Sequence, residues 1–152
     1  MGDRYRVRAA RASDLEALAA LEQRIFPDPW ALESFREFLE RMILVAEDGG
    51  EVVGYTVARW VLEQGEILNL AVHPDHRRRR LASRLLHAAL DRLWEEGVRL
   101  AFLEVRESNT GARAFYERHG FAQVGRRRSY YRLPREDALI LARSLEDAGP
   151  GA

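Results

Sequence analysis

The sequence predicts an α/β (α+β) fold on a mixed, mostly antiparallel sheet with one central parallel pair of strands. The 152 residues match the usual size of a single domain. Hydrophobic residues make up 47% of the chain, enough for a buried core, and charged residues make up 32%. A strand, a helix and a second strand follow one another over about 66–105, and such a crossover is right-handed and joins parallel strands.

The first forty residues predict a strand and two helices. Residues 5–9 favour a short strand. Ser13 and Glu16 match a capping box, which would begin a helix that runs to residue 25. After a turn at the segment FPDPW, aromatic residues at helical spacing predict a second helix over roughly 31–40.

The middle of the chain predicts three strands. Two β-rich runs, 42–48 and 51–61, flank Gly49-Gly50 and indicate an antiparallel hairpin, because glycine readily takes positive φ. The run 66–73 is almost continuously apolar, which suits a strand covered on both faces.

The remaining elements follow from breaks and caps. After Pro74 a long helix is predicted to about residue 96, followed by a strand over 100–105. Ser108 or Asn109 would cap a shorter helix that Gly120 ends. Segments 121–132 and 138–145 resemble a closing hairpin, so we expect one domain over 1–146 and a flexible tail over 147–152.

Composition excludes several classes of function. Arginine supplies all 24 basic residues and balances 24 acidic ones, so net charge does not favour nucleic acid or a membrane as partner. Without cysteine there is no disulfide, thiolate zinc site or cysteine nucleophile. The four histidines show no metal-binding spacing, and we expect no metal. No apolar run reaches the roughly 20 residues of a membrane span, and no signal-peptide core begins the sequence, so a cytoplasmic location is expected.

An arginine cluster follows the apolar strand. The strand 66–73 leads through a turn into a helix, and we place Arg77, Arg78, Arg79 and Arg80 in its first turns. A helix N-terminus presents free N–H groups and the positive end of its dipole, so this cluster indicates a phosphate site. The alternative is a solvated charge run paired with nearby acidic residues.

The segment LNLAVHPDHRRRRLASRLL, residues 68–86, resembles the acetyl-CoA-binding motif of the Gcn5-related N-acetyltransferase (GNAT) superfamily. The motif reads Arg or Gln, two residues, Gly, one residue, then Gly or Ala. Arg77 and Ala82 match its ends, and Arg80 replaces its glycine. We expect Arg80 to be helical already, with negative φ, and its side chain to pair with a cofactor phosphate.

The resemblance extends over about 5–145. The segments LEVRESNTGARAFYERHGF, RRRSYY, REDALIL and FPDPW are similar to the RimI-like branch, the ribosomal-protein-alanine N-acetyltransferases. The resemblance implies a GNAT fold whose parallel strands splay to admit acetyl-CoA. It also implies acetyl transfer, without a metal, to the N-terminal α-amine of a protein, an N-terminal alanine of a ribosomal protein above all.

The same resemblance implies catalytic roles for two residues. Glu104 would be the general base and Tyr116 the general acid. From the residues alone, the favoured interpretation of Glu104 is a carboxylate paired with Arg99 or Arg106, and that of Tyr116 is a core aromatic residue. Strand alternation places Glu104 on one face with Phe102.

Further residues are candidates for binding. Main-chain groups of Leu70, Ala71 and Val72 would pair with the pantetheine arm or hold the oxyanion, while their side chains pack in the core. The remaining cofactor candidates are the helix-start residues Leu81, Ala82 and Ser83, and Asn109, which is also a plausible helix cap. For the acceptor we name Phe26, Trp30, Tyr130 and Tyr131, each of which has aromatic core or hairpin packing as its alternative.

Two other functions stay open. One is acetylation of a small amine, such as a polyamine or an aminoglycoside. The other is a non-catalytic acyl-CoA-binding module, because the motif glycine is replaced. The sequence leaves the acceptor and the oligomeric state undetermined.

Overall fold

Seven strands form one mixed sheet in the computed structural model, which describes residues 4–77 and 79–146. The sheet order is β1-β2-β3-β4-β5-β7-β6; β4 and β5 run parallel, and the other neighbours run antiparallel. This confirms the predicted sheet, while the expected tail over 147–152 lies outside the described residues. The strands are β1 (Tyr5–Ala9), β2 (Met42–Asp48), β3 (Glu51–Val61), β4 (Gln64–Val72), β5 (Leu100–Arg106), β6 (Ala122–Arg132) and β7 (Arg135–Ser144).

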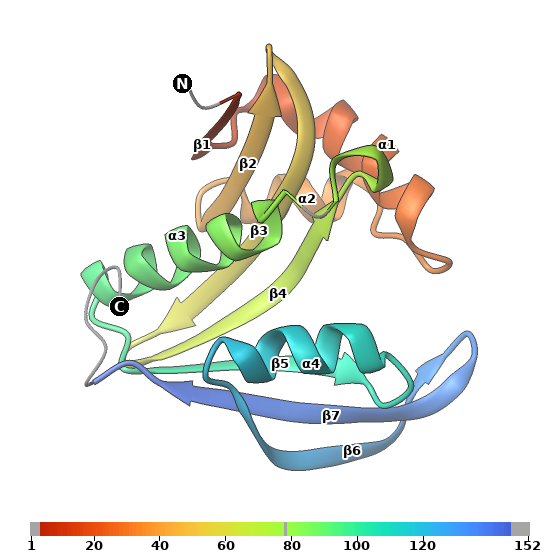
Figure 1. Ribbon diagram of the computed structural model, residues 1–152, viewed down its shortest axis with the longest axis vertical. Coiled ribbons are helices and arrows are strands. Elements are labelled where there is room, and N and C mark those ends of the chain that lie inside the picture. Colours follow the sequence, from red (N-terminus) through yellow and green to blue (C-terminus); the bar gives the residue numbers. More distant parts are fainter. Residues whose placement is uncertain (1–3, 78, 147–152) are drawn as a thin grey trace.

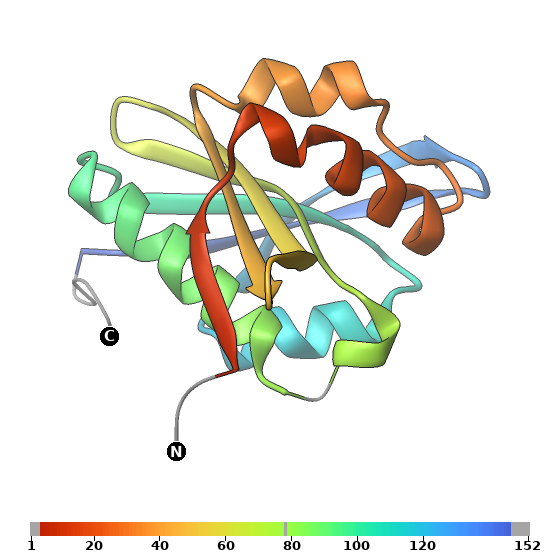
Figure 2. The same cartoon turned by 90° about the horizontal axis from the view of Figure 1, so that it is seen from above.

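Helices cover both faces of the sheet (Figures 1 and 2). Helices α1 and α2 lie on one side, α3 and α4 on the other. None of the helices within the described residues is long and apolar enough to cross a membrane. Their bounds are α1 (Leu15–Ile25), α2 (Leu32–Phe38), α3 (Leu81–Glu95) and α4 (Thr110–Arg118), with 3-10 turns η1 (Ala12–Asp14) and η2 (Pro74–His76).

Each pair of helices buries its own apolar cluster against the sheet. Between α1, α2 and the sheet, Leu18, Phe35 and Tyr55 are completely buried. On the other face, Leu85 of α3 and Leu103 of β5 belong to the larger cluster. The sheet is therefore buried on both faces around its centre, as the nearly continuous apolar run of β4 predicts.

The β2–β3 hairpin turns at the predicted glycine pair. Gly49 has φ 58° and Gly50 has φ 90°, both in the region that favours glycine. The flanking strands pair in antiparallel register from Asp48 and Glu51 outward. The prediction from Gly49-Gly50 is confirmed, because the turn depends only on these residues and the strands beside them.

β4 separates from β5 halfway along its length (Figure 1). The two strands pair only from Gln64 to Ile67 of β4. On the β3 side, Ile67 and Asn69 pair with consecutive residues, so Leu68 is an extra residue that makes a β-bulge. A bulge bends its strand, and from Leu68 onward the edge of β4 toward β5 has no paired strand among the described residues. The expected splay of the parallel pair is confirmed.

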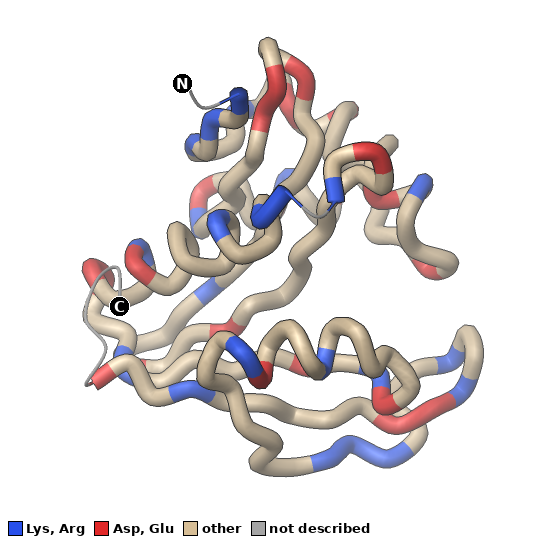
Figure 3. Tube along the Cα trace, in the orientation of Figure 1, with Lys and Arg blue, Asp and Glu red and all other residues tan. Residues whose placement is uncertain are grey.

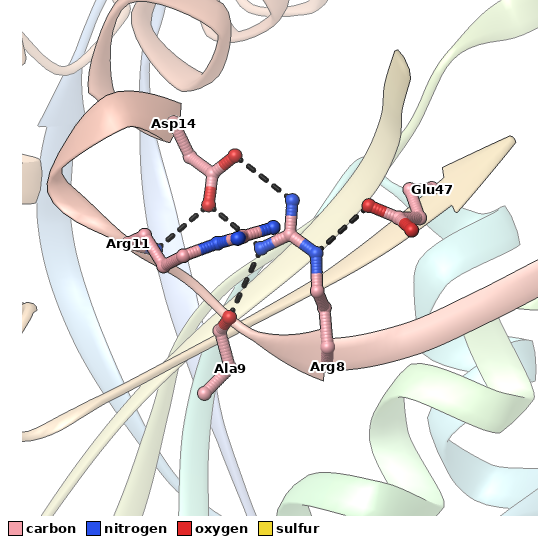
Figure 4. A network of polar contacts seen from close by, with 5 residues as sticks. All are labelled: Arg8, Ala9, Arg11, Asp14 and Glu47. Atoms are coloured by element: carbon pink, nitrogen blue, oxygen red, sulfur yellow. Dashed lines mark hydrogen bonds and ion pairs between the residues drawn. The ribbon is translucent and has the colours of Figure 1, made fainter. Parts of the chain in front are cut away.

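The predicted capping box at the start of α1 is wrong. Helix α1 begins at Leu15 after the turn η1. The side chain of Asp14, and not that of Ser13, accepts the backbone hydrogen bond before the helix. The Asp14 carboxylate accepts the backbone N–H of Arg11 at 2.7 Å and two hydrogen bonds from the Arg8 guanidinium at 2.8 and 3.0 Å (Figure 4). Bidentate charge-assisted bonds outweigh a neutral hydroxyl cap, and only the fold brings Arg8 there.

Asp14→Asn is expected to lower the free energy of unfolding by about 2 kcal/mol at neutral pH, because it weakens bonds to a largely buried guanidinium. Arg8 also donates to Glu47 at 2.8 Å, which keeps part of its charge compensated. Urea unfolding of both proteins measures the difference. Glu16→Gln, at an exposed carboxylate of α1, is the control and should change stability by under about 0.5 kcal/mol.

The same pair predicts a pH dependence. Hydrogen bonds from Arg8, against the opposing effect of burial, lower the pKa of Asp14 below its ordinary value of 3.8. The stability that Asp14 contributes is therefore complete above the pKa of the unfolded chain and is lost as the pH falls through the folded pKa. The gap between wild type and Asp14→Asn should shrink below about pH 4. A gap that widens on acidification would contradict this assignment.

Candidate active site

The arginine cluster precedes helix α3 and does not lie in its first turns, which corrects the expectation. α3 begins at Leu81, and Arg80 is its N-cap with φ 61° and ψ 19°. The expectation of a helical Arg80 with negative φ is therefore wrong. The chain enters α3 through this one left-handed residue, a conformation that glycine adopts without steric cost.

The N-terminus of α3 presents free backbone donors. The first helical hydrogen bond runs from Arg84 N–H to the Arg80 carbonyl at 3.0 Å. The N–H groups of Leu81, Ala82 and Ser83 consequently have no acceptor among the described residues, and Arg80 forms no side-chain cap. Leu81 is 1% exposed, so it offers only its main chain. Such an uncapped terminus suits an anionic phosphate.

Basic residues mark the chain between η2 and α3 in Figure 3. Their surroundings differ: Arg77 donates through Nε to the Val72 carbonyl, at the end of β4, at 3.1 Å. Arg79 helps to lower the pKa of Asp48, after the larger effect of the Arg4 hydrogen bond. Arg79 and Arg80 are exposed beside the free helix terminus. Arg78 lies outside the described residues.

The open edge of β4 carries the other cofactor candidates. Leu70, Ala71 and Val72 follow the bulge, and on their other edge they pair with β3. Ala71 is 6% and Val72 8% exposed, so these side chains pack in the core. Residues of β4 after the bulge thus have an open main-chain edge toward β5 while the side chains of Ala71 and Val72 pack in the core, as the sequence suggests. The edge leads directly toward the turn that precedes α3.

Glu104 lies on β5 beside the point where β4 departs. Its side chain is 19% exposed, and its Oε2 lies 2.6 Å from Nε of Arg127 in β6. This ion pair lacks hydrogen-bond geometry, and Oε2 accepts no hydrogen bond from the described residues. The expected partners are wrong: Arg106 pairs with Glu136 at 3.1 Å, and Arg99 donates to backbone carbonyls. The carboxylate therefore faces the Arg127 guanidinium on β6.

A groove of about 780 Å³ runs beside Glu104 on the α2 side of the sheet. Phe38, Trp60 and Phe102 give it apolar walls, and Arg127 closes it near the carboxylate. Alternation along β5 predicts that Phe102 shares the face of Glu104, and this is confirmed. Sequence reasoning missed Phe38 and Trp60 as groove residues, because only the packing of α2 over β3 brings them there.

Tyr130 and Tyr131 are close enough to Glu104 for its charge to affect them. Burial, and then the charge of Glu104, raise the pKa of Tyr131 to about 12 and also raise that of Tyr130. The Arg106 guanidinium lies 4.1 Å from the centre of the Tyr131 ring. The structure thus brings both tyrosines to the side of the expected base, although Tyr130 remains 50% exposed.

Phe26 and Trp30 pack against the core, which is the alternative to acceptor binding that the sequence left open. Both contact the cluster beneath α1 and α2, and the Trp30 ring lies 5.3 Å from that of Phe35 and 5.7 Å from that of Phe38. Neither lines the groove beside Glu104. Trp30 still adjoins the groove indirectly, because Phe38 belongs to both.

Tyr116 lies on the opposite face of the sheet from the groove. It projects from α4 against the cluster that includes Phe121, and burial raises the pKa of its phenol. Within the described residues its hydroxyl forms no hydrogen bond. Glu104 and Tyr116 therefore flank β5 from its two faces. Asn109 accepts the N–H of Ala112 at 3.1 Å, so it is the predicted cap of α4.

The fold brings the histidines together in two pairs. The rings of His73 and His76 lie 5.6 Å apart, and those of His87 and His119, distant in sequence, lie 5.3 Å apart. Across residues 4–77 and 79–146, no three metal-ligating side chains converge on one point.

Comparisons with known proteins agree with this geometry. The family model described as the acetyltransferase (GNAT) family matches residues 15–121. The ribosomal protein bS18-alanine N-acetyltransferase of Escherichia coli K12 is 34% identical over 90% of this chain and 95% of its own length. The protein of that name from Salmonella typhimurium is 37% identical over 86% of this chain and 90% of its own.

The crystal structure of the Escherichia coli ribosomal-protein-alanine N-acetyltransferase superposes with a TM-score of 0.87 at 32% identity. It covers 97% of this chain and 98% of its own. The Ard1 structure from Thermoplasma volcanium, at 24% identity, shares the fold with a TM-score of 0.88 and covers 93% of this chain and 98% of its own. An open strand edge beside an uncapped helix suits the acetyl-CoA on which these enzymes depend, and the chain belongs to the GNAT family of acetyltransferases.

Proposed function

We propose that this acetyltransferase moves the acetyl group of acetyl-CoA to the N-terminal α-amine of a protein, an N-terminal alanine of a ribosomal protein above all. The observation that carries the proposal is the separation of β4 from β5 after Ile67, with Glu104 beside the gap. The names of the relatives at 34% and 37% identity support the choice of acceptor.

Acetyl-CoA would bind along the open edge of β4. The amide-rich pantetheine arm pairs with main-chain groups of Leu70, Ala71 and Val72 as an added strand would. The pyrophosphate sits at the free N–H groups of α3, where Arg79 and Arg80 add charge. Arg77 acts by holding the end of β4, and Asn109 by fixing the start of α4.

Acid and base act from opposite faces of β5. Glu104 removes a proton from the acceptor ammonium through water, and the amine attacks the thioester carbonyl. A β4 N–H near Ala71 steadies the oxyanion while the new C–N bond forms. The C–S bond then breaks, Tyr116 gives its proton to the departing thiolate, and the newly bonded nitrogen releases its second proton to solvent. Solvent afterwards takes the proton from Glu104 and returns one to Tyr116.

The acceptor would approach through the groove at Glu104. Tyr130 and Tyr131 adjoin the carboxylate and suit contact with an extended peptide end. Phe26 and Trp30 would anchor the segment between α1 and α2 by packing against the core.

Mass spectrometry of a mixed pool tests the acceptor class. The pool contains peptides with a free N-terminal alanine, the same peptides with blocked N-termini, a polyamine and an aminoglycoside, incubated with enzyme and acetyl-CoA. We expect one added acetyl group on the free peptides alone. Acetylation of the small amines alone would instead support the second candidate, and acetyl-CoA binding without any product would support a non-catalytic module.

Arg80→Gly should separate the two effects of the arginine. Glycine removes the cost of the left-handed backbone, about 1 kcal/mol, so the free protein should keep or gain stability. Losing the charge near the phosphates should raise the Kd of acetyl-CoA about ten-fold. Calorimetric titration and thermal unfolding measure the two quantities. Unchanged or tighter acetyl-CoA binding would reject the phosphate contact.

We also propose that residues 1–146 act as one domain in the cytoplasm. The single sheet that contains β1 to β7 supports the proposal of one domain. The balance of 24 basic and 24 acidic residues favours neither nucleic acid nor a membrane as partner. A binding assay with DNA at low and high salt checks this, since any phosphate-driven binding would weaken steeply with salt.

A further inference from the structure

A buried carboxylate lies away from the expected catalytic residues. Glu22 of α1 is 2% exposed, and its two oxygens accept hydrogen bonds from three directions. The Tyr55 hydroxyl and the Asn69 amide, the latter at 2.7 Å, donate to Oε1. The backbone N–H of Trp30 donates to Oε2 at 3.0 Å. One side chain thus joins α1, β3, β4 and the segment after α1.

The partners match the chemistry of a carboxylate, which only accepts. Each is a neutral donor, and no ion pair of the described residues includes Glu22. Burial raises the pKa of Tyr55, and its hydrogen bond to Glu22 and then the charge of Glu22 raise it further. Leaving buried donors without an acceptor is costly, so the three groups are held where the carboxylate can reach them.

Two of the donors connect to parts of the proposed active site. Trp30 ends the FPDPW segment, which joins α1 to α2, and its ring lies 5.7 Å from that of the groove residue Phe38. Asn69 is the first residue after the bulge at Leu68, where the open edge of β4 begins. The Asn69 carbonyl also accepts the Thr56 hydroxyl at 2.9 Å, which fastens this point to β3. Glu22 therefore links the segment 26–30 to the start of the open edge of β4.

We propose that Glu22 is a positioning residue that fixes the segment 26–30, which packs on the groove residue Phe38 through Trp30, relative to the open edge of β4. This inference rests on the proposed transfer to a peptide amine. Direct attack requires the amine and the thioester at contact distance, and displacement by about 1 Å can cost 100-fold in rate. The buried hydrogen bonds of Glu22 link segment 26–30 to β4 and so restrict how far the distance between amine and thioester can vary.

Glu22→Gln breaks the link on the segment side. A glutamine has one accepting oxygen, which would serve Tyr55 and Asn69, so its NH₂ group would face the N–H of Trp30. Asn69→Leu breaks the link on the strand side and keeps the branching and the number of heavy atoms of the side chain. Tyr55→Phe removes the third donor and leaves the connection between segment and strand intact, which makes it the matched control.

The test measures peptide KM, kcat, acetyl-CoA Kd and thermal midpoint for these three variants and the wild type. Glu22→Gln and Asn69→Leu should each raise peptide KM about ten-fold or more and lower kcat, with acetyl-CoA Kd within about two-fold. Tyr55→Phe should lower the thermal midpoint while peptide KM stays within about two-fold of wild type. Wild-type peptide KM in both Glu22→Gln and Asn69→Leu, or an equal rise in Tyr55→Phe, would overturn the inference.

Hydrogen exchange of the Trp30 amide provides a readout that needs no acceptor. We expect protection in the wild type and in Tyr55→Phe, and its loss in Glu22→Gln; an unprotected Trp30 amide in the wild type would overturn the link. If Glu22→Gln fails to fold, Asn69→Leu carries the kinetic comparison. If the wild type acetylates no peptide while its Trp30 amide is protected, the proposed function fails and the link remains.

Discussion

Glu104→Gln is expected to lower kcat by about 100-fold to 10,000-fold, the range that general acid-base groups contribute. The amide keeps the size of the side chain but cannot take a proton from the acceptor ammonium. Because Glu104 lies on the groove side of β5, away from the free N-terminus of α3, acetyl-CoA Kd should remain within about two-fold. Steady-state kinetics with a peptide acceptor and calorimetry with acetyl-CoA measure the two effects.

A second glutamate of the same region is a matched control. Glu107 lies just beyond β5 and pairs with Arg126 of β6 at 2.6 Å, as Glu104 pairs with Arg127 at 2.6 Å. Glu107→Gln therefore breaks an equivalent ion pair and should leave kcat within about two-fold, since exposed pairs contribute little. Equal losses in both variants would assign the effect to the hairpin of β6 and β7 and remove Glu104 from the mechanism.

Tyr116→Phe is expected to lower kcat about 100-fold while acetyl-CoA binding is retained. The departing thiolate would lose its proton donor. Stability should change by less than about 1 kcal/mol, because within the described residues the hydroxyl forms no hydrogen bond and the ring keeps its contacts with Phe115 and Phe121. Single-turnover kinetics separates the chemical step from product release.

The raised pKa of Tyr116 adds a prediction about pH. Burial favours the neutral phenol, so the acid stays protonated up to and beyond the usual tyrosine range near pH 10. In the wild type, this group should cause no fall of kcat between pH 7 and about pH 10. The deficit of Tyr116→Phe should be constant across that range. Wild-type turnover in the variant at pH 7 would dismiss the assignment.

Local patterns predict most of the elements. The hairpin at Gly49-Gly50 and the helix between Asn109 and Gly120 depend on residues that are neighbours in the chain. Their turn, cap and terminator act within a few residues of one another, so a single sequence contains the necessary information. The parallel arrangement of β4 and β5 follows equally, because the intervening helix allows only a crossover.

The start of α3 shows where local reasoning fails. Four consecutive arginines before an apolar helix seem to belong to its first turns, yet the helix begins only at Leu81. The 3-10 turn η2 and the residues after it come between β4 and α3, and the chain enters α3 through the N-cap Arg80. Arg80 consequently takes a left-handed conformation that its own preferences disfavour.

Side-chain partners were the least predictable feature. Glu104 pairs with Arg127 because β7 inserts between β5 and β6 and places both residues at one groove. Neighbouring arginines in the sequence, Arg99 and Arg106, are drawn to backbone carbonyls and to Glu136. Glu22 has partners at separations of 8, 33 and 47 residues, and no spacing rule connects them.

By itself the sequence determined the succession of strands and helices. It also named the start of the helix after Pro74 as a candidate phosphate site, and its resemblance to the family named Glu104 and Tyr116 as candidates for acid-base chemistry. Turns, caps and periodicity act over a few residues and are written in adjacent positions. Only the tertiary structure decided the bulge that opens β4, the pairing of Glu104 with Arg127 and the network at Glu22. These arise where distant segments bury polar groups together, and the nearest donor there depends on how the whole sheet is ordered.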